Sequence, residues 1–192
     1  MNWGLQIKQR NDFAFYNEAF SDFEINQIIK CTVKREKIIA EVHSEEKAIV
    51  NESVRKTIIQ WVPTVEQNSW LYRKITDLVN LANSQYFGFD LLTIEELQFS
   101  IYNVGGFYGK HVDHLASTPG NPRKLSFTMQ LTDPSEYEGG STFLYTSENP
   151  HVITKEKGSI TFFPSYILHE VEPVTAGTRT ALVGWVSGPP FK

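Results

Sequence analysis

The residues of this chain best suited to hold a metal ion are His111 and Asp113, which are separated by a single residue. On an extended strand, residues at i and i+2 point their side chains to the same face, so an imidazole and a carboxylate would lie together. A third ligand must come from elsewhere, and His169, which follows the apolar residues 166–168, is placed to supply it. The sequence therefore predicts a site with two histidines and one carboxylate.

Such a ligand set on one side of an iron(II) ion leaves three coordination positions open, as in non-haem Fe(II) oxygenases. The His-x-Asp spacing alone is common, but here four features occur in order. They are the His-x-Asp pair, a turn at residues 138–140, a predicted strand over residues 158–164 that leads to His169, and Arg179 ten positions later (179 − 169 = 10). The alternative is that His111 is a surface residue of a strand and His169 a hydrogen-bonded histidine of the core.

With these motifs the chain resembles the prolyl-4-hydroxylase-like branch of the 2-oxoglutarate- and Fe(II)-dependent dioxygenases. The resemblance covers nearly the whole chain, and its C-terminal motifs are the more specific. The matching segments are residues 98–102, 106–113, 125–131, 133–140, 158–164 and 169–179, and in the N-terminal part Trp61, residues 70–72 and Asn83.

The resemblance implies the roles of four residues directly. His111, Asp113 and His169 would hold the iron, and Arg179 would pair with the distal carboxylate of the co-substrate 2-oxoglutarate. The guanidinium group matches a carboxylate with two parallel hydrogen bonds, which suits this pairing. Collagen-type prolyl hydroxylases usually have Lys at this position. Relatives that halogenate have a small residue in place of the aspartate, so Asp113 favours hydroxylation.

The resemblance also implies that Tyr102, Thr128 and Gln130 help to bind 2-oxoglutarate, and that Tyr108 and Trp185 border the substrate. Aromatic residues on strands are also common in cores, which remains the alternative for the three aromatic positions. On the predicted strand 123–132 the polar residues share one face, which is turned either to solvent or to the barrel interior. Some relatives place a Tyr near position 130, so the group that shares the carboxylate with Arg179 stays open.

The implied reaction is hydroxylation with O2, in which 2-oxoglutarate is converted to succinate and CO2 and ascorbate serves as reductant. A prolyl residue of a peptide or protein is the predicted substrate, and a free amino acid or other small molecule is the alternative. A cupin-like module that binds a metal or ligand without catalysis, and an inactive interaction domain, are alternatives from other classes. Arg179 argues against the first of these, and the intact ligand set argues against the second.

Composition limits the partners and the setting. The chain has 192 residues with a formal net charge of −4, which predicts a single domain and disfavours nucleic acid as a partner. A single cysteine excludes an intramolecular disulfide framework and favours a cytoplasmic, reducing setting. We see no signal peptide and no run of about 20 apolar residues that could span a bilayer. The sequence does not indicate an oligomeric state.

The predicted elements place these motifs in a mainly β fold with flanking helices (α+β). A strand is expected near residues 13–16, a helix from a capping box at Ser21 and Glu24 to about residue 34, and a strand over residues 51–63. A second helix is expected from residue 64 or 68 to about residue 87, stopped by Gly88.

Eight short strands follow, which suggests a sandwich or jelly roll, and the resemblance implies a double-stranded β-helix (jelly-roll, cupin-like) core. Residues 1–192 are expected to form one domain, with about 1–95 supporting a core of about 96–192. The eight strands are predicted over residues 96–104, 107–114, 123–132, 141–146, 151–154, 158–163, 168–173 and 179–187.

Overall fold

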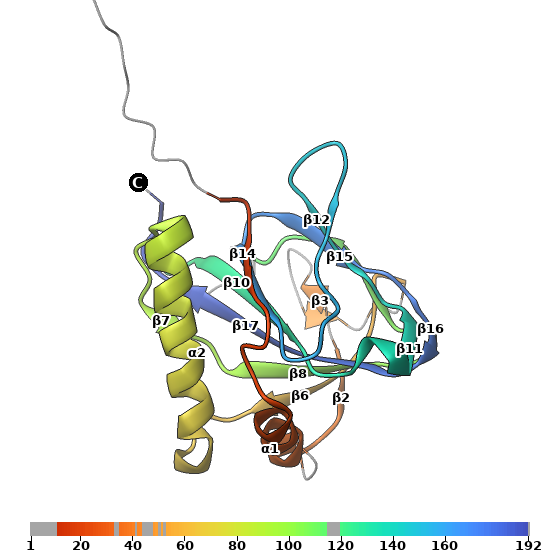
Figure 1. Ribbon diagram of the computed structural model, residues 1–192. Helices are drawn as coiled ribbons and strands as arrows, with labels where there is room; N and C mark the ends of the chain where they lie inside the picture. Colours follow the sequence, from red (N-terminus) through yellow and green to blue (C-terminus); the bar gives the residue numbers. More distant parts are fainter. Residues whose placement is uncertain are drawn as a thin grey trace, which may run out of the picture.

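The computed structural model describes residues 11–32, 35–40, 42–43, 48–49, 51, 53–114 and 120–191. This part of the chain consists mainly of antiparallel strands in two facing sheets, and two helices pack on the outer face of the larger sheet (Figure 1). The predicted mainly β fold with flanking helices is confirmed.

The larger sheet contains strands from both halves of the chain. Three N-terminal strands, β1 (Ala14–Tyr16), β2 (Ile38–Ile39) and β6 (Ile58–Val62), belong to the same sheet as strands of the C-terminal part. In spatial order it runs β1 (Ala14–Tyr16), β14 (Ile160–Pro164), β10 (Arg123–Gln130), β17 (Arg179–Ser187), β8 (Leu97–Tyr102), β6 (Ile58–Val62) and β2 (Ile38–Ile39), and β7 (Thr93–Ile94) pairs with β17.

The smaller sheet carries the two histidine motifs. Two neighbouring strands of this sheet are far apart in the sequence: they are the second and the seventh of the eight predicted strands. In spatial order it runs β13 (His151–Val152), β12 (Thr142–Tyr145), β15 (Leu168–Val171), β9 (Phe107–His111) and β5 (Arg55–Lys56). Two further strand pairs are β11 (Tyr137–Gly139) with β16 (Val174–Gly177), and β3 (Val42–His43) with β4 (Ala48–Ile49).

The first helix, α1 (Asp22–Thr32), begins at the predicted capping box. The Ser21 backbone N–H donates to the Glu24 carboxylate at 2.8 Å, and the Glu24 N–H donates to the Ser21 hydroxyl at 3.4 Å, so two amides at the helix start are satisfied. Ile25 and Ile28 face the core, as the spacing predicts. Helical spacing of the apolar residues also predicts a buried Phe23, which is wrong, because Phe23 lies on the opposite side of this short helix and is 71% exposed.

The capping carboxylate also binds Lys74 of the second helix, with the Lys74 Nζ 2.5 Å from Glu24. Burial raises the pKa of Glu24, but the hydrogen bonds from Lys74 and Ser21 outweigh burial and leave the pKa below its ordinary value. A lowered folded-state pKa contributes stability above the unfolded value and loses it as the pH falls through the folded value.

We therefore expect Glu24→Ala to lower the free energy of unfolding by about 1 kcal/mol at pH 7, since a cap and a partly exposed ion pair are lost together. Most of this difference should disappear as the pH falls below 4.5 and through the folded-state pKa, because the wild-type carboxylate then becomes protonated. Urea unfolding across this range measures both, with Glu148→Gln in an exposed loop as control. An equal difference at every pH would contradict the ion-pair account.

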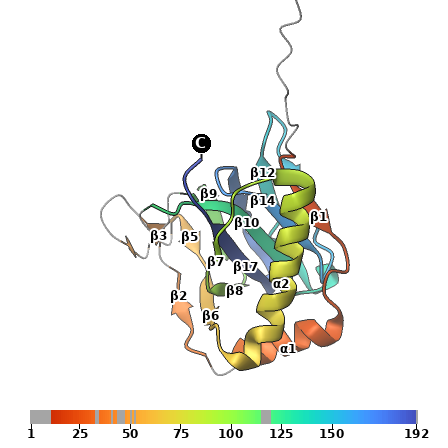
Figure 2. The ribbon, with the colours of Figure 1, turned by 90° about the vertical axis from the view of Figure 1, so that its left-hand side faces the viewer.

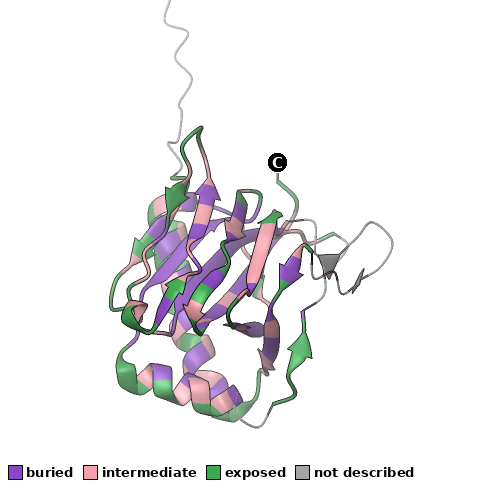
Figure 3. Ribbon diagram, turned by 90° about the vertical axis from the view of Figure 1, so that its right-hand side faces the viewer, coloured by how far each residue is buried: buried purple, intermediate pink, exposed green. Residues whose placement is uncertain are grey.

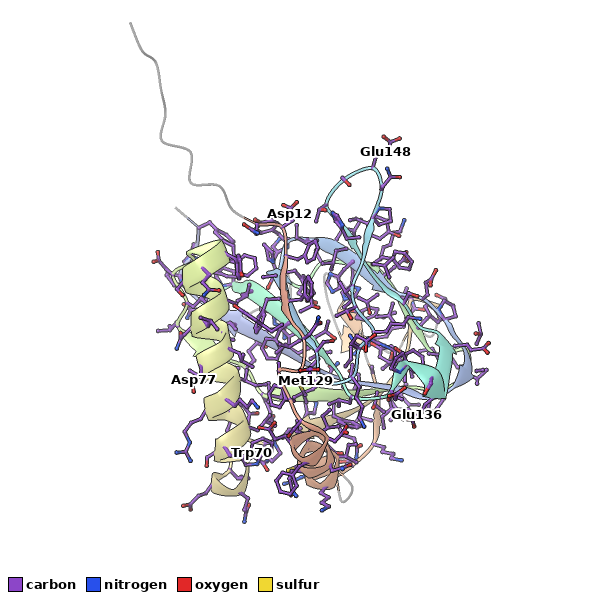
Figure 4. All side chains as sticks on the ribbon, viewed as in Figure 1. Asp12, Trp70, Asp77, Met129, Glu136 and Glu148 are labelled. Atoms are coloured by element: carbon purple, nitrogen blue, oxygen red, sulfur yellow. The ribbon has the colours of Figure 1, made fainter. Side chains whose placement is uncertain are left out.

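The second helix packs across the outer face of the larger sheet (Figure 2). A 3-10 turn, Glu66–Asn68, leads into α2 (Ser69–Ala82), and a π-helical turn, Asn83–Phe87, ends at Gly88, whose φ of 63° is left-handed. The spacing of the apolar residues at steps of three and four predicts one inward face for this helix, and Leu71, Ile75, Val79 and Ala82 on it are all buried. In Figure 4, Asp77 lies on the outer side of this helix and Met129 in the interior. Neither this helix nor any other in the described residues is long and apolar enough to cross a membrane.

Apolar and polar side chains alternate along β10, so they lie on opposite faces of the larger sheet. Leu125, Phe127 and Met129 belong to the core beneath the helices. The polar residues between them are equally buried, so their face points into the barrel interior and not to solvent. Figure 3 shows that buried positions run through the strands, whereas many exposed ones lie on loops and on α1. The polar side chains on this inner face are therefore placed to contact a ligand inside the barrel.

The predicted strand 51–63 is wrong in one respect, since it consists of two strands that belong to different sheets. β5 pairs with β9 in the smaller sheet, and β6 pairs with β8 in the larger one. The chain changes sheets at Thr57, whose hydroxyl donates to the Phe107 carbonyl at 3.2 Å. The sequence analysis also missed β7, β11 and β16, because strands of two to four residues are too short to show an alternating pattern.

Candidate metal centre and adjoining cavity

Strand pairing brings the two histidines together. His111 at the end of β9 lies directly opposite His169 on β15, and the ring centroids are 4.0 Å apart. Asp113 does not lie on a regular strand, because β9 ends at His111. The Asp113 backbone N–H instead donates to the Ser165 carbonyl at 2.9 Å, and this contact turns the carboxylate toward the histidines. The expected grouping is thus present, but strand periodicity is not its cause.

The three side chains form a set that could hold one metal ion. The Nε2 atoms of His111 and His169 lie 3.6 and 3.5 Å from the two carboxylate oxygens of Asp113, and the three ligand atoms lie within 4.8 Å of one another. The Nδ1 atoms lie 2.8 Å from the Gly109 carbonyl and 2.9 Å from the Ile167 carbonyl. A carbonyl can only accept, so each Nδ1 carries the proton and each Nε2 lone pair faces the carboxylate. This donor set fits a divalent transition metal such as Fe(II).

Electrostatics keep these ligands in the forms that a metal binds. Burial lowers the pKa of His111 to about 3, and the neighbouring His169 acts in the same direction, whereas Asp113 opposes them. Burial raises the pKa of Asp113, but the two histidines, Ser126 and Trp185 together hold it below its ordinary value. A neutral His111 imidazole beside an ionised Asp113 carboxylate is therefore expected at neutral pH.

A serine pair supports the aspartate from the larger sheet. The Ser126 hydroxyl on β10 donates to Asp113 Oδ2 at 2.7 Å, and the Ser126 and Ser165 hydroxyl oxygens are 2.9 Å apart. Because both serines are completely buried, this support keeps the carboxylate in one orientation.

We expect Ser126→Ala to weaken Mn(II) or Fe(II) binding by roughly tenfold, since lost support of a ligating carboxylate usually costs 10- to 100-fold in metal affinity. Anaerobic calorimetric titration of purified protein measures the dissociation constant. Ser187→Ala is the matched control, because Ser187 is also buried but donates to Glu95, which is not in the metal cluster. Equal affinities of the two variants would show that the serine does not support the site.

The metal cluster opens into a cavity between the two sheets. Four residues at alternate positions of β17, Arg179, Ala181, Val183 and Trp185, line one side of it. The first and last of these lie about 20 Å apart along the strand. Trp185 is close enough to Asp113 to lower the pKa of its carboxyl group. The metal cluster therefore lies near the Trp185 end of this row, and Arg179 lies at the other end. The other lining residues are Arg55, Gln98, Tyr102, Tyr108, His111, Asp113, Thr128, Thr142, Phe163, His169 and Val171.

Arg179 is a buried cation within this cavity, with 2% of its surface exposed. Its Nη2 donates to Gln130 Oε1 at 3.0 Å and to Thr142 Oγ1 at 3.2 Å, and its guanidinium lies 5.1 Å from the centre of the Tyr102 ring. Within the described part of the chain, no carboxylate forms an ion pair with it. A buried guanidinium held only by neutral groups is suited to bind an anionic ligand.

The structure brings all the sequence-predicted site residues to this cavity or its wall. Tyr102, Tyr108, Thr128 and Trp185 line the cavity, and Gln130 contacts Arg179. Tyr108 also stacks on His111, with ring centroids 3.5 Å apart. His114, which directly follows Asp113 in the sequence, is not in the cluster.

Sequence reasoning missed other residues of the site, notably Arg55, Thr142 and Ser165. Arg55 lies on β5, whose pairing with β9 was not predicted, and its guanidinium stacks 4.4 Å from the centre of the Tyr108 ring. Thr142 follows the Gly139-Gly140 turn, but no spacing rule connected it with Arg179. Their roles depend on neighbours across strands, so no local signal could have identified them.

Comparison with known proteins adds the family context. Residues 97–187 match the model of the 2OG-Fe(II) oxygenase superfamily. A PKHD-type hydroxylase of Prochlorococcus marinus is 41% identical over 93 residues, which are 48% of this chain and 42% of the relative. Another from Rippkaea orientalis is 33% identical over 128 residues, or 64% of this chain and 58% of the relative. The chain thus spans about half the length of the curated relatives it matches.

Solved structures establish the jelly-roll fold. A prolyl-4-hydroxylase of Pseudomonas putida has a TM-score of 0.73 and 21% identity, covering 93% of this chain and 94% of that one. A viral collagen prolyl hydroxylase from Paramecium Bursaria Chlorella virus-1, solved as a 2OG complex, gives 0.69 and 21%, covering 93% and 97%. A prolyl hydroxylase of Trichoplax adhaerens, in complex with a hypoxia inducible factor peptide fragment, gives 0.70 and 17%, covering 92% and 83%. At these identities the likeness concerns the fold.

Proposed function

We propose that this chain is a 2-oxoglutarate- and Fe(II)-dependent hydroxylase of the prolyl-hydroxylase-like kind, because residues 97–187 match the model of the 2OG-Fe(II) oxygenase superfamily and the fold resembles that of a solved prolyl-4-hydroxylase. One observation carries the proposal. The cluster of His111, Asp113 and His169 and the buried cation Arg179 line the same cavity. A metal centre joined to a carboxylate anchor is what a keto diacid co-substrate requires.

In this proposal His111, Asp113 and His169 would hold the iron, which when bound supplies the reaction of O2 with the substrate. Arg179 binds the distal carboxylate of 2-oxoglutarate, while Thr142 and Gln130 fix the orientation of its Nη2. Tyr102 and Thr128 form the adjoining cavity wall. Because the wall between the two ends consists largely of apolar groups such as Val171 and Val183, water is excluded and the Arg179 ion pair is strengthened.

The proposed substrate is a prolyl residue of a peptide or protein. The similarity to PKHD-type hydroxylases and to structures of prolyl hydroxylases, one of them solved with a peptide fragment, supports this class. Tyr108 and Trp185 would border the substrate, because both line the cavity close to the metal cluster. We also propose that residues 1–192 act as one unit, because β1, β2 and β6 share the larger sheet with the strands of the C-terminal part.

The test is succinate formation from 2-oxoglutarate by purified protein with Fe(II), O2 and ascorbate. Reactions would contain proline-rich peptides, free proline, other free amino acids or no added substrate. Stimulation by peptides alone would support the prolyl class, and stimulation only by free amino acids would overturn it in favour of a small-molecule hydroxylase. No turnover under any condition, together with no metal-dependent binding of 2-oxoglutarate, would overturn the hydroxylase proposal as a whole.

A further inference from the structure

Behind Arg179, on the strand β11 that precedes the Gly139-Gly140 turn, lies a buried tyrosine for which the proposed reaction has no role. Tyr137 is 5% exposed, and its hydroxyl has no hydrogen bond of good geometry, although it lies close enough to Arg179 for the guanidinium to act on it. Nη1 of Arg179 is also completely buried and has no hydrogen-bond partner. Two orphaned polar atoms in the same part of a core are costly, because each has lost water without gaining a partner.

These two side chains meet around Gly140, where the backbone has a left-handed φ of 59°. A Cβ placed on Gly140 would lie 3.1 Å from Arg179 Cδ and 3.5 Å from Tyr137 Cε2, so the turn passes tightly against both. Lys155 closes the outer side, with its Nζ 2.6 Å from the Gly139 carbonyl and 5.3 Å from the centre of the Tyr137 ring. The phenol is therefore enclosed between the glycine turn, Lys155 and the guanidinium.

The hydrogen-bond inventory of Arg179 shows what remains available. A guanidinium has five N–H donors, and Nη2 uses two of them on Gln130 and Thr142, which leaves three (5 − 2 = 3). Those three belong to Nη1 and Nε. Tyr137 does not line the cavity, whereas Arg179 does. The phenol oxygen can thus accept from the guanidinium on the side away from the ligand space, without competing for that space.

We propose that Tyr137 is a positioning residue for 2-oxoglutarate: its hydroxyl accepts from Nη1 of Arg179 and sets the guanidinium to receive the distal carboxylate. The inference rests on the proposed function. Burial raises the pKa of Tyr137, although Arg179 opposes this shift, so the phenol is neutral at physiological pH and remains available as an acceptor. Arg179 already acts on the Tyr137 hydroxyl without ligand, and in this proposal the contact tightens into a full hydrogen bond when the carboxylate binds the guanidinium.

The test is anaerobic calorimetric titration of the Mn(II)-loaded protein with two ligands. 2-Oxoglutarate carries the distal carboxylate, and 2-oxobutanoate has the same keto acid end without it. Tyr137→Phe is expected to raise the dissociation constant for 2-oxoglutarate about tenfold and to leave that for 2-oxobutanoate unchanged, because a hydrogen bond to a charged group is lost only where the carboxylate binds. In an Arg179→Met background, Tyr137→Phe should add nothing further.

Each outcome decides a separate question. If the wild type does not bind 2-oxoglutarate, the proposed function itself fails. If the wild type binds it and Tyr137→Phe binds it equally well, the positioning role is overturned. A similar loss for both ligands, or a variant that does not fold, would assign the hydroxyl a structural role instead. Tyr166→Phe is the control, because Tyr166 is exposed and does not line the cavity.

Discussion

Replacing His111 with alanine is expected to lower the rate of Fe(II)-dependent conversion of 2-oxoglutarate to succinate by a factor on the order of 10³ or more. The imidazole is one of the three proposed metal ligands, and it is fixed by its Nδ1 contact to Gly109, by stacking on Tyr108 and by pairing opposite His169. Alanine leaves only Asp113 and His169, which cannot hold iron on one face with three positions open.

The measurement combines succinate formation with an anaerobic metal titration, so that loss of metal and loss of chemistry are seen separately. His114→Ala is the control, since this neighbouring histidine lies outside the cluster. Chelation of the wild type should reproduce the His111→Ala result, and added Fe(II) should restore activity to the wild type but not to the variant. Full turnover in His111→Ala would show that the metal is held elsewhere.

Replacing Arg179 with methionine is expected to weaken 2-oxoglutarate binding by at least about 100-fold. The side chain is a buried cation of the cavity, and a paired, desolvated carboxylate loses several kcal/mol when its partner is removed. The unliganded protein should behave differently. There the guanidinium is a buried charge without a carboxylate partner among the described residues, so methionine should not lower the melting temperature and could raise it.

Two experiments check this prediction. Calorimetry gives the 2-oxoglutarate dissociation constant, and thermal unfolding with and without 2-oxoglutarate shows whether ligand-linked stabilisation, present in the wild type, is lost in the variant. The 2-oxoglutarate dissociation constant of Arg179→Lys should fall between those of the wild type and Arg179→Met, because lysine keeps the charge but cannot form two parallel hydrogen bonds. Arg73→Met on the exposed side of α2 is the control. Unchanged ligand-linked stabilisation in Arg179→Met would place the carboxylate elsewhere.

Local patterns predicted the parts of this structure whose signals are short in sequence. The capping box at Ser21 and Glu24, the stop at Gly88 and the inward stripe of α2 are contained within single elements. The break between β5 and β6 escaped prediction because a single residue, Thr57, separates the two strands, so that they form one extended run in the sequence. What separates them is the sheet each one joins, and that choice is made by β9 and β8.

For the candidate site, the sequence by itself determined which residue types are available and their order: His111, Asp113, His169 and then Arg179. Only the tertiary structure decided how they meet. It paired β9 with β15, placed the Ser165 carbonyl against Asp113, turned the polar face of β10 inward and brought Tyr137 behind Arg179. The physical reason is that spacing fixes the direction of a side chain only within one regular element. Contacts between elements depend on strand register and sheet packing, which no single stretch of the chain encodes.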